Sequence, residues 1–249
     1  MPRKLGQHFL VRDSILQTLA VALCGDHAPR VIEIGAGRGA LTRHLLPRTN
    51  ELHAIELDGS LASYLESRFV TEPKLRVHRA DVLSINLAQW GPAVIAGNLP
   101  YYITSPIIHR FLRLDDRFPV AVFLMQSEVA DRVLAAPSTH SYGYLTVTTR
   151  LICNVELVCR VAASAFVPPP KVESSAVRFQ RKSEFPPDID DLLTFVSRCF
   201  GKKRKTLRNN LRPFYGAAIE TLPESRLRAE QLTVDQFIDL HRRLSGSEN

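Results

Sequence analysis

The chain has 249 residues, of which 45% are hydrophobic and 23% are charged, and this composition excludes a disordered or low-complexity protein. Lysine and arginine outnumber aspartate and glutamate by 32 to 25, which gives a formal net charge of +7. A basic balance favours a polyanionic partner, because neutralising phosphates releases condensed counterions, although charge alone does not identify that partner.

Apolar, strand-like runs alternate with helical patterns through the first half of the chain. Strands are predicted at residues 31–34, 51–55, 75–80, 93–97 and 120–125. Helices are predicted at residues 40–46 and 60–69, between the first three of these strands. Strands that alternate with helices predict a mostly parallel sheet with helices on both faces, an α/β fold of the Rossmann-like kind.

The pattern changes in the third quarter of the chain. Residues 146–160 are apolar and β-branched with no helix stop, and residues 174–179 form another strand-like run. The prolines between them, at 168–170, require a loop or an extended segment, because proline lacks a donor and fixes φ. We therefore expect these runs to add antiparallel strands to the sheet.

From residue 188 onward the apolar residues recur at helical spacing. They are Leu192, Leu193, Val196, Cys199, Leu207, Leu211, Phe237, Leu240 and Leu244. This periodicity predicts two domains: residues 1–184 form the α/β domain, and residues 185–249 form a small α-helical domain.

The sequence lacks the signals that mark metal sites, signal peptides and membrane spans. Cys24, Cys153, Cys159 and Cys199 form no CxxC pair, and no histidine cluster has metal-ligand spacing, so we predict no metal site. The N-terminal stretch has no apolar signal-peptide core, and no apolar run reaches membrane-spanning length. We expect a cytoplasmic protein that does not enter a membrane.

A glycine cluster follows the first predicted strand, with Gly35, Gly37 and Gly39 in the spacing GxGxG. Glycines let the backbone approach a ligand at the carboxyl end of the sheet, where open α/β folds bind ligands. The dinucleotide fingerprint is GxGxxG, and position 40 is alanine. The tighter spacing favours an adenosyl ligand without phosphates, although a tight turn that binds nothing also fits.

Acidic residues follow the second and third strands. Glu56 can accept hydrogen bonds from both hydroxyls of a ribose, with Asp58 as an alternative, and this supports a nucleoside without specifying which one. Asp81 can accept a hydrogen bond from the amino group of an adenine. It can equally be the N-cap of the segment that follows.

The tetrapeptide Asn98-Leu99-Pro100-Tyr101, directly after the fourth strand, resembles the [Asp/Asn/Ser]-Pro-Pro-[Tyr/Phe/Trp] element of amino-group methyltransferases. An amine on an aromatic base is a weak nucleophile, because its lone pair is delocalised. The Asn98 oxygen and a backbone carbonyl nearby can accept its two N–H bonds and orient its lone pair. Proline rigidifies the loop, and Tyr101 offers a face on which the base can stack. No metal and no general base are needed.

Beyond this motif, the whole chain resembles the small-subunit ribosomal RNA adenine dimethyltransferase family, whose loss confers kasugamycin resistance. Four motifs carry the resemblance in the right order: Gly6-Gln7-His8-Phe9-Leu10, Asn98-Leu99-Pro100-Tyr101-Tyr102-Ile103-Thr104, Phe166-Val167-Pro168-Pro169-Pro170-Lys171-Val172-Glu173-Ser174, and Lys203-Arg204-Lys205-Thr206-Leu207-Arg208-Asn209-Asn210-Leu211. The sequence departs from the family where Ala36 and Arg38 replace the more usual proline and leucine, and where His8 replaces a common asparagine.

The resemblance implies a class I S-adenosylmethionine-dependent methyltransferase that acts on 16S RNA of the small ribosomal subunit. It implies two methyl transfers to each of two adjacent adenines near the 3′ end of that RNA. The cofactor pocket would contain His8, Leu10, Gly35, Gly37, Gly39, Glu56, Asp81, Val82 and Asn98. The target adenine would lie between Tyr101 and Phe166, although His8 taken alone resembles a surface residue and Phe166 a core residue.

Residues 201–212 contain six basic side chains and no acidic one. They are Lys202, Lys203, Arg204, Lys205, Arg208 and Arg212. A solvated helix face is the usual origin of such a run. The lack of compensating acids, together with Asn209 and Asn210, favours contacts with RNA phosphates, which position the RNA without reading its sequence.

Three other functions remain to be weighed. A large-subunit RNA methylase of the macrolide-resistance type shares the fold and the amine chemistry, but more often has isoleucine in place of Leu99. A non-catalytic RNA-binding assembly factor is a second possibility, against which the intact Asn98 motif argues. An NAD-dependent dehydrogenase fails on the glycine spacing. We predict a monomeric enzyme.

Overall fold

The computed structural model describes residues 8–186, 188–202 and 204–246. Its contacts divide the chain into two units. The first, here called the sheet unit, contains residues 1–130 and 154–181. The second, here called the helical unit, contains residues 131–153 and 182–249.

Within its described residues, the sheet unit is built on a seven-stranded sheet with the order β4-β3-β2-β5-β6-β9-β7. The strands are β2 (Ala28–Ile34), β3 (Thr49–Glu56), β4 (Leu75–Arg79), β5 (Val94–Asn98), β6 (Val120–Gln126), β7 (Cys153–Val161) and β9 (Ser174–Arg181). The pairs from β4 to β6 are parallel, and β9 is antiparallel to β6. The five strands predicted in the first half and the strand at 174–179 are therefore confirmed.

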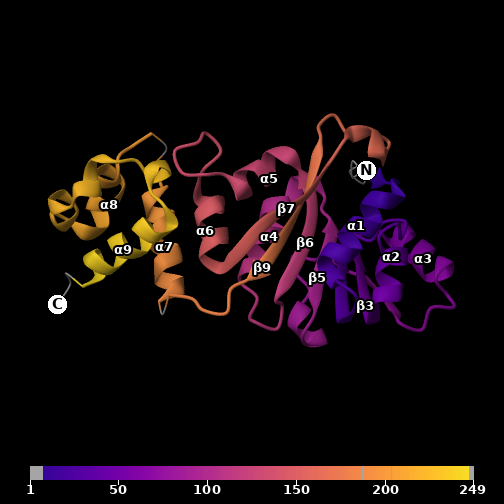
Figure 1. The fold of residues 1–249 in the computed structure, drawn as a ribbon. Coiled ribbons are helices and arrows are strands. Elements are labelled where there is room, and N and C mark those ends of the chain that lie inside the picture. The colour runs from indigo at the N-terminus through magenta and orange to yellow at the C-terminus, as the bar shows by residue number, and fades with distance from the viewer. Residues whose placement is uncertain (1–7, 187, 203, 247–249) are drawn as a thin grey trace. The chain divides into compact units, whose positions relative to one another are not determined.

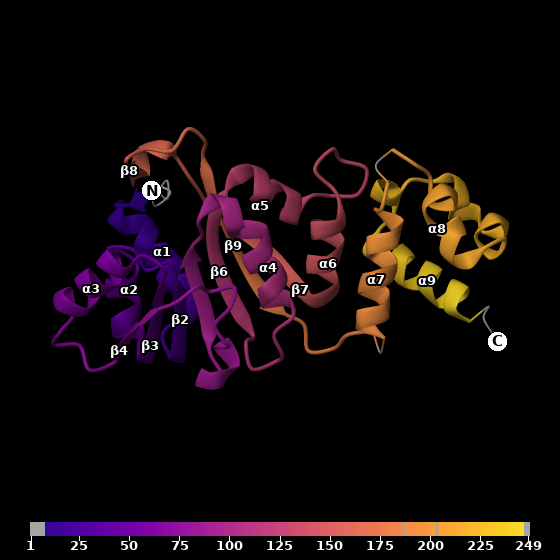
Figure 2. The same ribbon diagram turned by 180° about the vertical axis from the view of Figure 1, so that it is seen from behind.

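The helices of the sheet unit lie on both faces of the sheet. They are α1 (Asp13–Cys24), α2 (Thr42–Leu45), α3 (Gly59–Arg68) and α4 (Thr104–Leu112), and α5 (Ser127–Leu134) begins in this unit. Figure 1 shows α1 in front of the sheet, and Figure 2, from behind, shows α4 across the opposite face. The helix predicted at 40–46 is shorter than expected: residues 40 and 41 lie in a turn, and α2 ends at Leu45, before the 3₁₀ turn Leu46–Arg48 that contains Pro47.

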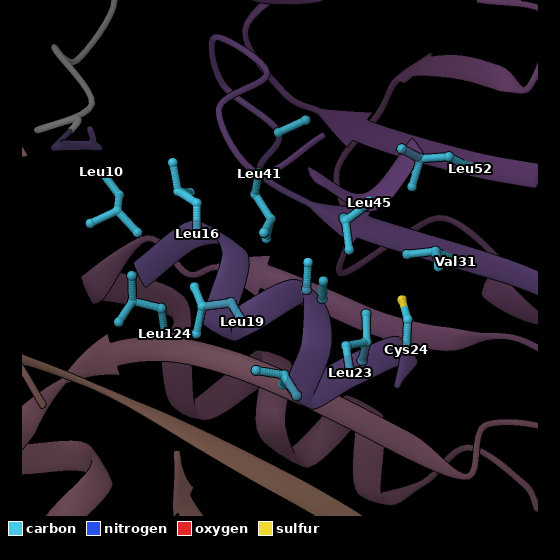
Figure 3. Packing of buried hydrophobic residues seen from close by; sticks show 14 of the residues in the cluster. Leu10, Leu16, Leu19, Leu23, Cys24, Val31, Leu41, Leu45, Leu52 and Leu124 are labelled. Carbon is cyan, nitrogen blue, oxygen red and sulfur yellow. The ribbon is translucent and has the colours of Figure 1, made fainter. Parts of the chain in front are cut away.

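The core on one face of the sheet is aliphatic. Figure 3 shows Leu16, Leu19 and Leu23 of α1 packed beside Leu45 of α2 and Leu124 of β6. Burial of such side chains stabilises the fold by about 1.5–3 kcal/mol each. This packing fixes the helices against the sheet and holds the loops at the carboxyl ends of the strands.

The strand order reverses at β2, since β3 lies on one side of it and β5 on the other. In open α/β sheets, the loops after two such strands run in opposite directions and leave a crevice at their carboxyl ends. The loop after β2 carries the glycines, and the loop after β5 carries Asn98 to Tyr101. The topology thus brings the two motifs together.

The helical unit contains α6 (Tyr144–Ile152), α7 (Ile189–Cys199), α8 (Leu207–Tyr215) and α9 (Val234–Ser245). The expected domain boundary assigned 131–153 to the α/β domain, but these residues group with the C-terminal helices. The Tyr142 hydroxyl donates to the carbonyl oxygen of Leu232 at 2.7 Å, and Lys182 Nζ donates to that of Arg150 at 2.6 Å. No helix within the described residues is long and apolar enough to cross a membrane.

The expectation of strand structure throughout 146–160 is wrong in its first half. Residues 144–152 form α6, and only Cys153–Val161 is a strand. Threonine suits a helix when its hydroxyl bonds a carbonyl of the preceding turn, and Thr148 Oγ1 donates to the Tyr144 carbonyl at 2.8 Å. Thr146 Oγ1 donates to the Arg132 carbonyl, so contacts within the helical unit override the β propensity.

Candidate cofactor and catalytic site

A pocket lies at the carboxyl ends of β2, β3, β4 and β5, and it brings together most of the residues that the sequence singled out. The predicted residues that line it are His8, Leu10, Gly35, Gly37, Glu56, Asp81, Val82, Asn98, Leu99, Pro100 and Tyr101. Gly39 and Phe166 are not among the lining residues. Phe9, Glu33 and Tyr102 also line the pocket and were not assigned to it from the sequence, and Arg38, noted above as a departure from the family, lines it too.

The glycine loop turns sharply beneath the pocket. Gly35 and Gly37 have φ angles of +68° and +56°, which favour glycine. A Cβ atom on Gly37 would lie 3.1 Å from the Phe9 ring, so a side chain here would push against the pocket wall. A Cβ atom on Gly39 would instead lie 2.5 Å from the Phe69 ring. Gly39 therefore allows close packing against the C-terminal end of α3, and its assignment to the cofactor pocket stays a prediction.

Glu56 is buried at the end of β3 and is held by the backbone. Its Oε2 accepts from Gly37 N at 2.9 Å, and its Oε1 accepts from Asp58 N at 2.9 Å. A carboxylate has further lone pairs on both oxygens, so Glu56 can still accept from two hydroxyls. The alternative, Asp58, is the N-cap of α3, since it accepts from Ser60 N and Leu61 N.

Asp81 has a local role in the turn that follows β4. Its Oδ1 accepts from Leu83 N at 2.8 Å, so it closes the turn that follows β4. Its second oxygen makes no hydrogen bond to the described residues that the structure records, and the residue lines the pocket. One oxygen thus shapes the turn, and the other is left for a donor in the pocket.

Glu33 is a pocket residue that the sequence reasoning missed. It is only 2% exposed, and Thr42 Oγ1 donates to its Oε2 at 2.6 Å. Burial, together with the nearby Glu56 carboxylate, raises the pKa of Glu33 from 4.5 to about 8. An acidic residue inside the apolar run Val31–Ile34 was the sequence signal that could have revealed it, because buried carboxyls are uncommon.

The charges of the pocket distinguish between ligands. Three carboxyl groups line it, and one of them, Glu33, is protonated at neutral pH because its pKa is raised to about 8. Among the described lining residues the one arginine, Arg38, lies over the Phe9 ring at 4.7 Å. A pyrophosphate would meet this acidic lining unfavourably, whereas a ligand with a positive charge is attracted by it. S-adenosylmethionine carries a sulfonium and an ammonium group and a ribose. The residues present therefore fit it better than they fit a dinucleotide.

A short ribbon closes one wall of the pocket. Strand β1 (Phe9–Leu10) pairs antiparallel with β8 (Phe166–Val167), so Leu10 lies opposite Phe166. The carbonyl oxygen of Pro168 accepts from His8 Nδ1 at 2.8 Å, which places the proton of a neutral His8 ring on Nδ1. Gly6 and Gln7 of the same motif lie outside the described residues.

The Asn98 amide is oriented by this N-terminal segment. Its Nδ2 donates to the carbonyl oxygen of His8 at 3.2 Å. An amide nitrogen that is engaged as a donor leaves the amide oxygen as the group available to the pocket. The neighbouring Leu99 N donates to the Leu124 carbonyl at 2.9 Å, which pins the loop to β6. Asn98 is therefore set to accept a hydrogen bond.

Tyr101 is held on two sides. Its hydroxyl lies 2.9 Å from Ser174 Oγ, and its ring stacks on the His8 ring with centroids 5.9 Å apart. Phe166, expected on the other side of the target base, is only 2% exposed and belongs to the hydrophobic core. The structure places Tyr101 at the pocket and buries Phe166 in the core, so stacking by Phe166 stays a prediction.

The basic segment lies in the helical unit, and Lys203 falls outside the described residues. Arg208 and Arg212, on α8, each lie 3.3 Å from Glu220, so their charges are compensated by an acid that the segment itself lacks. Asn210 is buried and donates to the Cys199 carbonyl at 2.7 Å. It holds the loop before α8, which corrects its assignment to phosphate contacts. Lys202, Arg204 and Lys205 are exposed.

The chain is similar to known proteins over nearly its whole length. The family model described as Ribosomal RNA adenine dimethylase matches residues 1–245. Ribosomal RNA small subunit methyltransferase A of Chlorobium chlorochromatii is 38% identical over 243 residues, which cover 96% of this chain and 91% of that protein. The protein of the same name from Porphyromonas gingivalis is 39% identical over 248 residues, which cover 96% and 95%.

Two solved structures are similar over nearly the whole chain. A dimethyladenosine transferase from Plasmodium falciparum has a TM-score of 0.81 and 27% identity, and covers 94% of this chain and 96% of that one. The 23S rRNA methyltransferase ErmE has a TM-score of 0.76 and 26% identity, and covers 95% and 99%. The predicted Rossmann-like class I methyltransferase fold, with its C-terminal helical part, is confirmed, and S-adenosylmethionine is the cofactor. The chain belongs to the ribosomal RNA adenine dimethylase family.

Proposed function

We propose that this enzyme methylates N6 of two adjacent adenines near the 3′ end of 16S RNA in the small ribosomal subunit, with two methyl groups added to each. The observation that carries the proposal is the Asn98 amide, whose nitrogen is engaged by the His8 carbonyl and whose oxygen is left for the pocket. Relatives that are 38–39% identical over nearly the whole chain are named small-subunit methyltransferases, which supports the choice of RNA.

Separate groups of pocket residues are proposed to bind the cofactor and the target adenine. We assign the ribose hydroxyls to Glu56 and the cofactor's adenine amine to Asp81. His8, Leu10, Gly35, Gly37 and Val82 complete that subsite. When bound, S-adenosylmethionine supplies an electrophilic methyl group.

Asn98 and the backbone of Leu99 are proposed to bind the target amine. Their oxygens accept its two N–H bonds, which favours the pyramidal form with the lone pair directed at the methyl group. Pro100 stiffens the loop, Tyr101 supports the base, and Phe166 is proposed as the second stacking ring. The alkylated amine is strongly acidic, so its proton leaves to water and no side-chain base is required.

The helical unit is proposed to bind RNA phosphates. Lys202, Lys203, Arg204 and Lys205 precede α8, and Arg208 and Arg212 lie on it. The ion pairs of Arg208 and Arg212 with Glu220 are solvent-exposed, and such pairs contribute only about 0–1 kcal/mol, so a phosphate can compete for either arginine. We propose that the enzyme acts in the cytoplasm as a monomer.

The test is transfer of labelled methyl groups to small subunits that lack the modification, with large-subunit RNA in parallel, followed by nucleoside analysis. Dimethyladenosine in small-subunit RNA alone is the expected result. Label in large-subunit RNA alone would overturn the choice of RNA. No label in either, with cofactor binding intact, would indicate a binding factor instead of an enzyme.

The variant Asn98→Ala tests the catalytic assignment. Removal of one oriented hydrogen-bonding group from an active site typically lowers turnover about 100- to 1000-fold. We expect a loss of this size, with the Kd for S-adenosylmethionine changed only a few-fold. Asn154→Ala, at an exposed position on β7, is the matched control. Near-normal turnover of Asn98→Ala would refute the role.

A further inference from the structure

The turn that follows β4 carries Asp81 into the cofactor pocket, and its shape is set by a compact group of hydrogen bonds. Leu83 N donates to Asp81 Oδ1 at 2.8 Å. The amides of Ser84 and Ile85 both donate to the Asp81 carbonyl at 3.0 Å. The orientation of the Asp81 carboxylate is therefore tied to the path of the backbone from 81 to 85.

A side chain from a different element holds this turn from outside the pocket. Arg110, in the second half of α4, donates from Nη1 to the carbonyl oxygen of Leu83 and from Nη2 to that of Ile85. A guanidinium is planar and rigid, so two bonds from its terminal nitrogens fix two carbonyl groups relative to each other. Its Nε is buried without a hydrogen-bond partner among the described residues. The hydrogen bonds that the guanidinium donates to described residues thus go to these two carbonyls.

The same helix also begins at the catalytic loop. α4 starts at Thr104, directly after the 3₁₀ turn Tyr101–Ile103, and Thr104 Oγ1 donates to the Pro100 carbonyl at 3.2 Å. One rigid helix therefore carries the loop that receives the target amine at its start and grips the Asp81 turn near its end. Arg110 does not line the pocket itself.

We propose that Arg110 is a positioning residue for recognition of the cofactor's adenine: it holds the Leu83 and Ile85 carbonyls so that the free oxygen of Asp81 faces the 6-amino group. Selectivity for that amino group then depends on a side chain that does not contact the cofactor. This inference rests on the proposed role of Asp81, and it names the residue through which that role is maintained.

Binding of two nucleosides measures the effect without methyl transfer. 5′-Methylthioadenosine carries the 6-amino group, and 5′-methylthioinosine has a carbonyl oxygen in its place, which a carboxylate repels. A site built to bond an amino group rejects an analogue that lacks it. We expect the wild-type protein to prefer methylthioadenosine at least tenfold, and Arg110→Met to lower this ratio about fivefold or more.

Two further variants separate positioning from general stability. Arg110→Lys can donate to one carbonyl but not to both in a fixed geometry, so it should recover part of the ratio, and it supplies the measurement if Arg110→Met does not fold. Arg113, the exposed residue directly after α4, provides the control. Arg113→Met removes a similar side chain and should leave the ratio unchanged. Urea unfolding of each variant reports stability separately.

The outcomes are distinct. A ratio that is unchanged in Arg110→Met and Arg110→Lys, whatever their stability, would overturn the inference and leave Arg110 a structural residue. An equal fall in Arg113→Met would overturn it as well. If the wild-type protein did not discriminate between the nucleosides, both this inference and the adenine role of Asp81 would fall. The Asn98 test of methyl transfer would be unaffected by that result.

Discussion

The buried Glu33 carboxyl allows a quantitative test, through the substitution Glu33→Gln. Glutamine keeps a side-chain oxygen that can accept from Thr42 Oγ1, so the substitution removes the titration while retaining that contact. The pKa of Glu33 is raised from 4.5 to about 8 by burial and by Glu56. The folded protein therefore holds this proton more tightly than the unfolded chain does.

The sign and the size of the effect follow by linkage. The stabilising contribution of the protonated carboxyl is complete below pH 4.5 and is lost as the pH rises toward 8, because the unfolded chain ionises first. At about 1.4 kcal/mol per pH unit, the wild-type protein loses on the order of 2 kcal/mol by pH 6 and on the order of 5 kcal/mol by pH 8.5. Glutamine at this position does not titrate, so the Glu33→Gln protein does not lose this part of its free energy of unfolding.

The assay is urea unfolding of both proteins at pH 5, 7 and 8.5, with the free energy of unfolding compared at each pH. The advantage of Glu33→Gln should grow steadily with pH. Glu66→Gln makes the same substitution at an exposed position on α3 and is the control. A difference between Glu33→Gln and wild type that does not vary with pH would refute the assignment of a raised pKa to this carboxyl.

Two other outcomes follow from the site and from the basic segment. Glu56→Gln should raise the Kd for S-adenosylmethionine about 10- to 100-fold, since charged hydrogen bonds contribute about 1.5–3 kcal/mol. Calorimetry measures this Kd. An affinity within twofold of wild type would show that Glu56 does not belong to the ribose subsite. The double substitution of Lys202 and Lys205 by glutamine should lower the slope of log Kd for small-subunit RNA against log salt by about 1.5, as two lost phosphate contacts require. An unchanged slope would contradict phosphate binding by these lysines.

The sheet could be predicted because its signal is local. Parallel strands buried on both faces give short apolar runs, and Val31–Ile34 and Val120–Met125 are such runs. The failure at 144–152 has a nonlocal cause, since the hydroxyl of Thr146 bonds a carbonyl fourteen residues away. A β-branched run carries no information about that partner. The assignment of 131–153 to the helical unit has the same origin.

The site was predictable in its residue types but not in its contacts. The sequence indicated that Asn98 accepts a hydrogen bond, but the donor contact that frees its oxygen joins residues 90 positions apart. Gly39 fits the glycine spacing, yet only the approach of Phe69 shows that it serves packing. Spacing along one strand and loop is visible in a sequence, whereas the neighbour across the fold is not.

The pairing of β1 with β8 has a consequence for how the enzyme matures. The residues that shape the reacting end of the pocket run from His8 to Ser174, and the earliest of them pairs with the β8 segment near the end of that span. A chain made from its N-terminus forms β2 to β6 before β8 exists. A nascent chain that stops before residue 166 can already have the glycine loop, Glu56 and Asp81, but β1 lacks its partner strand. Because His8 and Leu10 are assigned to the cofactor subsite, that subsite is complete only after β8 has been made. Full affinity for S-adenosylmethionine and methyl transfer should therefore both appear late in synthesis, and chains truncated before residue 166 should bind the cofactor more weakly than the whole protein.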